Sequence, residues 1–266
     1  MASPSPRPDR AAVVEPNYFS NWGDLWYPRL ANTLLLETAS RIRRLTPTMV
    51  TIGSFALYVL AAGLIVAGGW WSVVAAVLLP LSYVLDCLDG QLARYTAQTS
   101  AIGDYLDKTL DVLKVGVINL AFAVAAYRLT GESYYFLLGF ASSFGFLFRY
   151  YIKLETMFGA MQRDPEYLAK SGVRRRQLYA TLDAERAAPK SLRQRLDWLW
   201  FRHRSVFALD EAEHITFGAL AALMHRPDLW CWLFGIGQLV IALVRFVERG
   251  SQLQRRPESL TYPLRK

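Results

Sequence analysis

The sequence predicts an all-α integral-membrane protein with six transmembrane helices, preceded by an amphipathic helix that lies in the membrane interface. Hydrophobic residues make up 53% of the 266 residues, and they gather in long blocks with arginines between them. Blocks of 18 or more largely apolar residues are typical of helices that cross a lipid bilayer. The net charge of +8 would suit nucleic acid or an anionic membrane surface, and the apolar blocks favour the membrane.

The chain is expected to divide into a membrane domain and its flanking segments. Residues 1–20 are proline-rich near the start and lack the apolar stretch of a signal peptide, which predicts a disordered tail. Residues 21–45 mix Trp and Tyr with Arg at helical spacing, which indicates an interfacial helix; a helix packed on protein is the alternative. Residues 46–250 would form the membrane domain, and residues 251–266 a cytoplasmic tail.

Six hydrophobic segments are the candidate membrane spans. They cover residues 48–69, 71–92, 102–127, 133–153, 212–225 and 228–247. The first, second, third and sixth are long enough for a hydrocarbon core of about 30 Å, whereas the fifth is short. The two cysteines, Cys87 and Cys231, both fall inside apolar segments, so no disulfide framework is expected.

Positive charges indicate the orientation of the spans, because Lys and Arg accumulate in cytoplasmic loops. The stretch 154–211 holds eleven Lys or Arg residues, the segment before residue 48 holds six, and the tail after residue 248 holds five. The loops on the opposite side hold only Arg128 and Arg226. The sequence therefore predicts a multi-pass protein of the cell membrane with both termini in the cytoplasm.

A basic insert at 154–211 interrupts the membrane domain on the cytoplasmic side. Its residues 192–207 again mix Trp and Phe with Arg, a composition typical of a helix on a lipid surface. A solvated basic linker is the alternative interpretation of the same residues.

Acidic residues gather where the second apolar segment ends and the third begins. Asp86 and Asp89 lie three positions apart, and Asp107 and Asp111 lie four apart, so each pair shares one helix face. The polar stretch 95–102 between the pairs predicts a tight turn. Two antiparallel helices would then present their carboxylates to each other. Charged residues in membrane segments are costly, so this group is a candidate functional site.

Carboxylates at close range repel one another unless cations lie between them. Oxygen ligands suit Mg²⁺ or Mn²⁺, and the facing positions hold no His or Cys that would favour zinc. Two such ions form a known clamp for a phosphoryl group during displacement. Gly90 and Gly103 allow close approach of a ligand or helix, and the Arg94 guanidinium suits a phosphate.

The spacing of these residues resembles the signature of the CDP-alcohol phosphotransferases, also known as CDP-alcohol phosphatidyltransferases. All eight fixed positions of D-x2-D-G-x2-A-R-x8-G-x3-D-x3-D are present, as Asp86, Asp89, Gly90, Ala93, Arg94, Gly103, Asp107 and Asp111. The resemblance covers residues 45–153 well, including the Leu45-Thr46-Pro47 start of the first span, and the C-terminal half in general layout.

The resemblance implies a role for each matching residue. Two divalent ions, Mg²⁺ or Mn²⁺, would be bound by Asp86, Asp89, Asp107 and Asp111, with Asp86 and Asp107 bridging them. Asp111 would also act as the general base. Contacts to the CDP group are expected from Gly90, Ala93, Arg94, Ser100, Gly103 and Thr51.

The acceptor site is expected at the cytoplasmic ends of the later spans. Arg149, Lys153 and Arg245 are candidates for binding an anionic acceptor. Basic residues at such positions also extend toward lipid headgroups, which is the competing interpretation.

The implied reaction moves a phosphatidyl or other phosphoryl-alcohol group from a CDP-alcohol to an acceptor hydroxyl, with release of CMP, in phospholipid biosynthesis. CDP-diacylglycerol is the expected donor, and a small alcohol or polyol phosphate the acceptor. The alternative within the family is a soluble CDP-alcohol that donates its headgroup to a lipid. A non-enzymatic cation-binding membrane protein is the alternative from another class, although Arg94 beside the carboxylates would repel cations. The resemblance also implies a homodimer.

Overall fold

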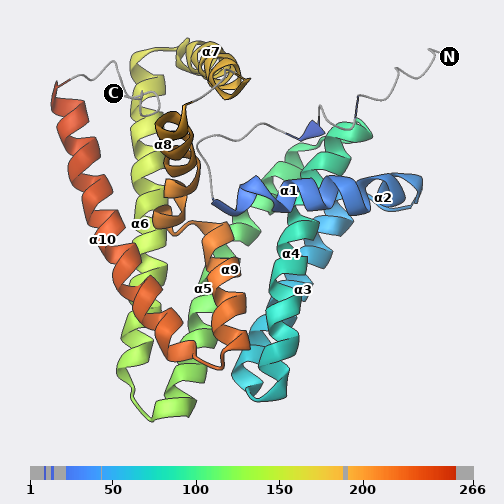
Figure 1. The fold of residues 1–266 in the computed structure, drawn as a ribbon, viewed down its shortest axis with the longest axis vertical. Helices are drawn as coiled ribbons and strands as arrows, with labels where there is room; N and C mark the ends of the chain where they lie inside the picture. The colour runs from blue at the N-terminus through green and yellow to red at the C-terminus, as the bar shows by residue number, and fades with distance from the viewer. Residues whose placement is uncertain (1–8, 10–12, 15–21, 43, 188–190, 256–266) are drawn as a thin grey trace.

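The computed structural model describes residues 9, 13–14, 22–42, 44–187 and 191–255, and these residues form helices joined by short loops (Figure 1). The predicted disordered tail at 1–20 lies mostly outside the described residues, as do residues 256–266 of the predicted C-terminal tail. No strand occurs in the described part of the chain, so the all-α prediction is confirmed.

Helices α3 (Pro47–Ala67) and α4 (Trp70–Tyr95) form the first hairpin. The Thr46 hydroxyl accepts a hydrogen bond from the Met49 amide, and Pro47 takes a first-turn position where its missing N–H costs nothing. Gly68 and Gly69 both have positive φ, at 74° and 55°, which lets the chain reverse between the two helices. The Leu45-Thr46-Pro47 start predicted from the sequence is thus a capped helix start.

Helices α5 (Ala101–Thr130) and α6 (Tyr134–Arg163) form the second hairpin. Gly131, in the left-handed conformation at φ 80°, ends α5. Helix α6 continues through the predicted end of the fourth segment at residue 153 and ends at Arg163. The first part of the basic insert is therefore an extension of a membrane-domain helix.

Helices α9 (Glu211–Leu223) and α10 (Pro227–Arg255) form the third hairpin. A capping box starts α9: the Glu213 carboxylate accepts a hydrogen bond of 2.9 Å from the Asp210 amide, and the Asp210 side chain accepts one in return. Residues 251–255, assigned to the tail from the sequence, continue α10.

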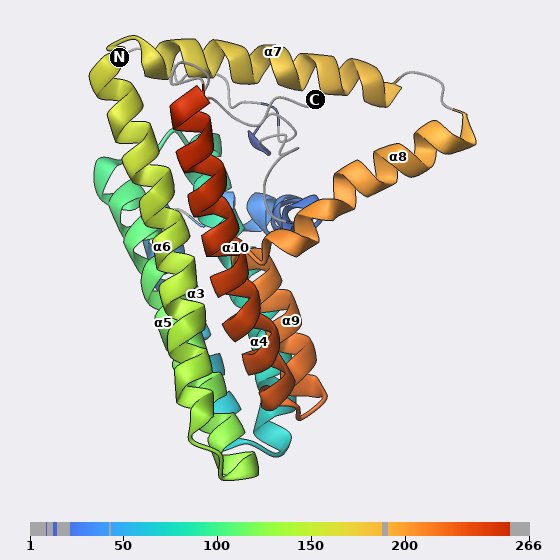
Figure 2. The same cartoon turned by 90° about the vertical axis from the view of Figure 1, so that its left-hand side faces the viewer.

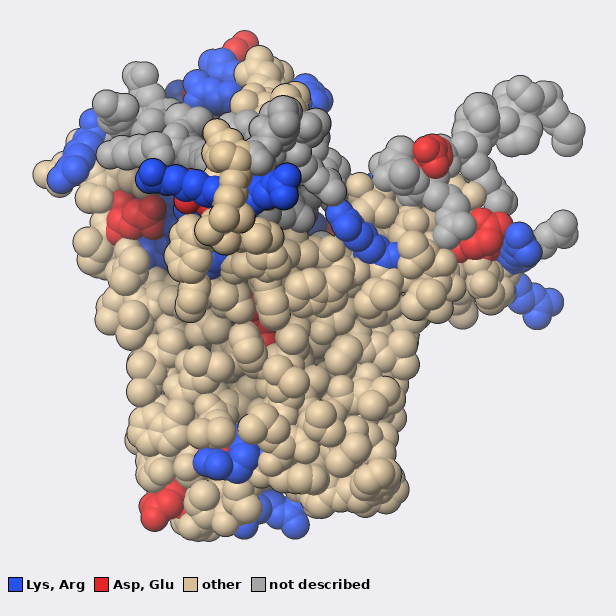
Figure 3. Space-filling model, viewed as in Figure 1, with Lys and Arg blue, Asp and Glu red and all other residues tan. Residues whose placement is uncertain are grey.

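Four of these helices, α3, α4, α5 and α10, are long and apolar enough to cross a membrane. The protein is therefore a multi-pass membrane protein. All six predicted segments are helical, but α9 has only 13 residues, and α6 is not among the four. The count of six spans accordingly stays a prediction. The space-filling view shows a largely uncharged band, with most of the visible Lys and Arg at one end of the molecule and fewer charged residues at the other end (Figure 3).

The segment before the first hairpin is a series of short helical pieces: η2 (Trp22–Leu25), α1 (Tyr27–Leu30), η3 (Ala31–Leu36) and α2 (Glu37–Arg41). It runs across one end of α3 and α4 rather than along them (Figure 1). Its inner face is buried against α4, where the Gln91 amide donates a hydrogen bond of 2.7 Å to the Pro28 carbonyl. The crosswise direction suits an interfacial helix, which stays a prediction.

The rest of the basic insert forms α7 (Tyr167–Ala187), α8 (Leu192–His203) and the short η4 (Arg204–Ala208). Helix α7 lies across the same end of the molecule, and α8 returns from it toward α9 (Figure 2). A capping box at Ser191 and Gln194 starts α8, and residues 192–207 are helical. Whether this segment is a lipid-surface helix or a solvated basic linker stays a prediction.

Helix packing places α3 against both α4 and α5, α9 against α4, and α6 against both α5 and α10. Among the described residues the backbones of α4 and α5 make few close approaches, although the two helices are consecutive. Their side chains still meet as predicted, since Lys114 on α5 donates a hydrogen bond to Asp86 on α4. The carboxylates at their junction therefore meet across a space that α3 and α9 help to enclose.

Candidate active site

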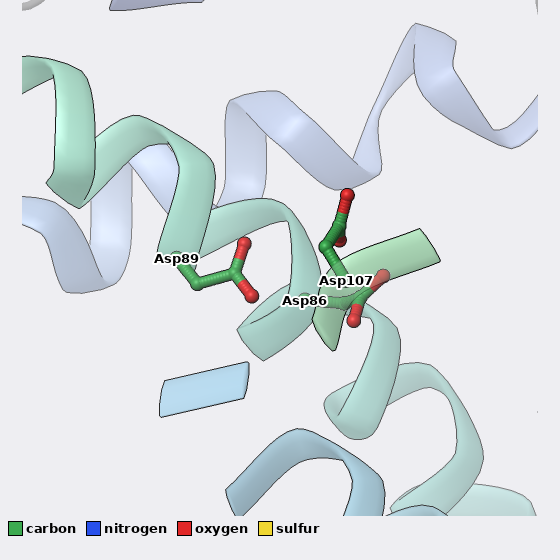
Figure 4. A group of neighbouring side chains, drawn as sticks. All are labelled: Asp86, Asp89 and Asp107. Atoms are coloured by element: carbon green, nitrogen blue, oxygen red, sulfur yellow. The ribbon is translucent and has the colours of Figure 1, made fainter. Parts of the chain in front are cut away.

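The aspartates of α4 and α5 form a compact group at the junction of the two helices. Asp86, Asp89 and Asp107 each offer a carboxylate oxygen within 4.8 Å of the others (Figure 4). Asp86 and Asp89 project from the same face of α4, and Asp107 comes from the second turn of α5. The helical spacing in the sequence predicted this meeting, and we name these three residues the first carboxylate group.

Asp89 is held in place by the neighbouring helix α3. The Thr51 hydroxyl donates a hydrogen bond of 2.5 Å to Asp89 Oδ2, and it also lies 3.2 Å from the Pro47 carbonyl. Asp89 is 6% exposed, so few water molecules compete for its oxygens. Thr51 on α3 thus orients the Asp89 carboxylate, and the sequence did not indicate this contact.

Asp86 belongs to a second group as well. Asp86, Asp111 and Glu211 also bring carboxylate oxygens within 4.8 Å of one another, and we name them the second carboxylate group. Glu211 is the first residue of α9, far from the aspartates in the sequence. Asp86 is the member that the two groups share. The metal-bridging role that the family resemblance implied for Asp86 and Asp107 stays a prediction.

The second carboxylate group surrounds the ammonium of Lys114. Its Nζ donates hydrogen bonds of 2.5 Å to Asp86 Oδ1 and 2.8 Å to Asp111 Oδ1, and lies 3.6 Å from Glu211 Oε1. The Lys114 side chain is 3% exposed. Neither Lys114 nor Glu211 is among the site residues predicted from the sequence. The signals that were available are a lysine inside an apolar helix, one turn after Asp111, and an acidic residue at the start of a span.

A polar pocket adjoins the first carboxylate group. Its lining comprises Pro47, Thr48, Thr51, Asp89, Gly90, Ala93, Arg94, Gln98, Thr99, Ser100, Gly103, Asp104 and Asp107. All six residues expected to contact CDP are in this lining, together with two of the predicted metal ligands. The pocket is therefore formed by the start of α3, the end of α4, the turn and the first turns of α5.

The turn between α4 and α5 is shaped by Ser100 and Gly103. The Ser100 hydroxyl accepts a hydrogen bond of 3.1 Å from the Gly103 amide and so caps α5. A Cβ on Gly103 would lie 3.1 Å from the same hydroxyl oxygen, so any larger residue would crowd the cap. Arg94, at the end of α4, donates from Nε to the Val13 carbonyl at 3.1 Å.

The three acceptor candidates have different partners in the structure. The Arg149 guanidinium binds the Asp210 carboxylate and donates to Gln238 Oε1 at 2.7 Å and to the Ala208 carbonyl at 2.8 Å. Arg245 is exposed and pairs with Glu248, one turn later on α10. Lys153 is exposed, with its ammonium 5.9 Å from the ring centre of Tyr150. Arg149 therefore joins α6 to the start of α9 and to α10.

The donor set of the first carboxylate group fits a hard divalent cation. All three ligands offer carboxylate oxygens, the ligand type that Mg²⁺ and Mn²⁺ prefer. The ammonium held by the second group shows that the same cluster already accommodates a cation. His214, near the second group, is buried among aromatic rings with its Nδ1 3.0 Å from the Asp210 carbonyl, and it belongs to neither group.

Comparison with known proteins places the aspartate motif within a family. Residues 44–163 match the CDP-alcohol phosphatidyltransferases, and the eight motif positions fall inside this match. The chain is also similar to the inner membrane protein YnjF of Escherichia coli (strain K12), with 39% identity over 82 residues. That alignment covers 31% of this chain and 38% of YnjF, so the chain matches less than half of that relative's length.

Proposed function

We propose that this protein transfers a phosphatidyl group from a CDP-alcohol to the hydroxyl of a second alcohol, with release of CMP. The match of residues 44–163 to the CDP-alcohol phosphatidyltransferases supports this proposal. The main support for this function is the polar pocket. It is lined both by the residues expected to bind CDP and by the carboxylates of Asp89 and Asp107. CDP-diacylglycerol is the proposed donor, and a small alcohol or polyol phosphate the acceptor. The reaction would contribute to phospholipid biosynthesis.

The pocket residues support a specific orientation of the donor. Gly90 and Gly103 carry no side chain at the pocket wall, which leaves their backbones accessible to a nucleotide. Arg94 provides the positive charge in this lining, suited to the phosphate next to the cytidine. The first carboxylate group would hold a divalent ion beside the same phosphates. When bound, such an ion neutralises charge on the phosphoryl oxygens.

Asp111 is the proposed general base. It accepts the proton of the acceptor hydroxyl, whose oxygen forms a bond to the β-phosphorus of the donor. The bond from that phosphorus to the bridging oxygen breaks, and CMP leaves with the electron pair. Lys114 donates to Asp111 Oδ1 at 2.8 Å, which orients the carboxylate and leaves Oδ2 for the hydroxyl.

Several further features are part of the proposal. The active site and both termini face the cytoplasm, where a water-soluble nucleotide product is released; the gathering of Lys and Arg at one end of the molecule supports this orientation. The protein acts as a homodimer, as the family resemblance implies.

The test is CMP release by the purified full chain in lipid nanodiscs with Mg²⁺ or Mn²⁺. One arm combines CDP-diacylglycerol with glycerol phosphate, inositol phosphate or serine; the other combines soluble CDP-alcohols with diacylglycerol. We expect release in the first arm and its loss on chelation. Release in the second arm alone would assign the lipid to the acceptor instead. The proposed function would be refuted if neither arm released CMP and the protein bound neither the donor nor the metal.

A further inference from the structure

Lys114 is a buried cation at the centre of the proposed active site, and the transfer mechanism above uses it only to orient Asp111. It lies one helical turn after Asp111 on α5, so both side chains extend from one face of that helix. Its ammonium contacts or approaches every member of the second carboxylate group. A lysine buried to this degree is costly unless its charge is matched, and here carboxylates from three helices, α4, α5 and α9, surround it.

We propose that the Lys114 ammonium permanently fills the second of the two cation positions at this site, so that the protein binds one divalent ion rather than two. This inference rests on the proposed function. The divalent ion belongs to the first carboxylate group, Asp86, Asp89 and Asp107. The second group, Asp86, Asp111 and Glu211, holds the ammonium.

The hydrogen-bond geometry supports this assignment. The distances of 2.5 and 2.8 Å to Asp86 and Asp111 are those of charge-assisted hydrogen bonds. An ammonium has three donors, and its third direction faces Glu211, whose Oε1 is buried and makes no hydrogen bond in the described part of the chain. Glu211 thus completes the set of carboxylates around the ammonium.

Crowding and charge oppose a second ion in the same place. The two carboxylate groups share Asp86, so a second divalent ion would bind oxygens that Lys114 already contacts. It would also place two positive charges next to the ammonium, with little water to screen them. The Lys114 side chain is 3% exposed, so it would have to leave the packed interior between the helices to make room for a second ion. The sequence-based expectation of two ions did not include this side chain.

The experiment counts bound Mn²⁺ on the full chain in nanodiscs after removal of metal by chelation. Equilibrium titration gives the number of ions per chain, and electron paramagnetic resonance separates an isolated Mn²⁺ from a spin-coupled pair a few ångströms apart. For the wild-type protein we expect one ion and an uncoupled spectrum. The count does not depend on turnover.

Lys114→Met removes the charge and keeps a side chain of similar length. We expect this variant to bind two ions with a coupled spectrum, because the emptied second group can then act as a ligand set. Adding Glu211→Gln to Lys114→Met should weaken the second ion by roughly tenfold or more. Lys108→Met, an exposed lysine on the same helix, is the matched control and should still bind one ion.

The results separate this inference from the proposed function. A wild-type protein that releases CMP and binds a coupled pair of ions would refute the role of Lys114 and leave the transferase intact. So would a folded Lys114→Met variant that still binds one ion. If Lys114→Met does not fold, the wild-type count decides. A wild-type protein that binds no ion and releases no CMP would refute both proposals.

Discussion

The Thr51 hydroxyl on α3 donates a hydrogen bond of 2.5 Å to Oδ2 of Asp89 on α4. Both residues are buried, at 3% and 6% exposure, and both line the polar pocket. A hydrogen bond that orients a ligating carboxylate commonly affects metal affinity as strongly as some ligands do. Thr51 was expected to contact the nucleotide; its position indicates that it also orients Asp89, a predicted metal ligand.

Thr51→Val tests this second role. Valine keeps the shape and removes the hydroxyl, so Asp89 loses its partner and we expect Mn²⁺ affinity to fall by about tenfold. Thr51→Ser retains the hydroxyl and should preserve affinity. The measurement is Mn²⁺ titration of both variants in nanodiscs. Equal affinity for the valine and serine variants would show that the hydroxyl does not orient the ligand.

Asp111→Asn tests the general base. The amide keeps the shape and a hydrogen-bonding oxygen, but it cannot take the acceptor proton, so turnover should fall by about 10²-fold or more. Donor binding should remain measurable, because Asp111 is not in the pocket lining. CMP release and binding of a non-reactive CDP-alcohol analogue are measured on the same preparation. Near-normal turnover would show that another group removes the proton.

Arg149→Leu separates an acceptor-binding role from a structural one. The Arg149 side chain is 13% exposed and its guanidinium is already engaged by Asp210, Gln238 and the Ala208 carbonyl. Breaking such a partly buried pair leaves polar groups unmatched, and we expect a loss of about 2 kcal/mol in the free energy of unfolding. The KM for the acceptor should change little in the protein that remains folded.

Thermal unfolding and acceptor titration together decide whether Arg149 has a structural or an acceptor-binding role. Arg245→Leu is the matched comparison, because Arg245 is an exposed arginine paired within its own helix and should cost little stability. A large rise in acceptor KM with unchanged stability in Arg149→Leu would restore the acceptor-binding interpretation.

Gly145→Ala tests the close approach of α6 and α10. A Cβ on Gly145 would lie 2.7 Å from the backbone carbon of Gln238, too near for the helices to keep their spacing. We expect a loss of about 1–3 kcal/mol in stability from this overpacking. Gly63→Ala on α3 is the control, since an added Cβ there meets nothing within 4 Å. Equal unfolding temperatures for the two variants would contradict the packing.

Much of the proposed site could be predicted because its spacing is local. The four aspartates fall on helix faces whose periodicity can be counted along the chain, and the first carboxylate group confirms that Asp86, Asp89 and Asp107 meet. The CDP candidates came from the family resemblance, and one pocket contains them all. Helix starts were predictable for the same reason, since the cap at Thr46 and Pro47 involves only adjacent residues.

Helix ends and acceptor contacts were less predictable. The fourth segment was predicted to end near residue 153, where the basic insert begins, yet α6 continues to Arg163. Arg149 carries no local sign of its partners, which come from the junction before α9 and from α10.

The sequence by itself determined an all-helical, membrane-spanning chain with a carboxylate motif at one helix junction, because apolar length and helical period are properties of short segments. Only the tertiary structure decided that Lys114 lies between the carboxylates of Asp86 and Asp111, with Glu211 3.6 Å from its ammonium. Glu211 reaches the aspartates because α9 packs against α4, and contacts between distant segments follow from how apolar faces fit together. That packing places a lysine where the motif had predicted a second metal ion.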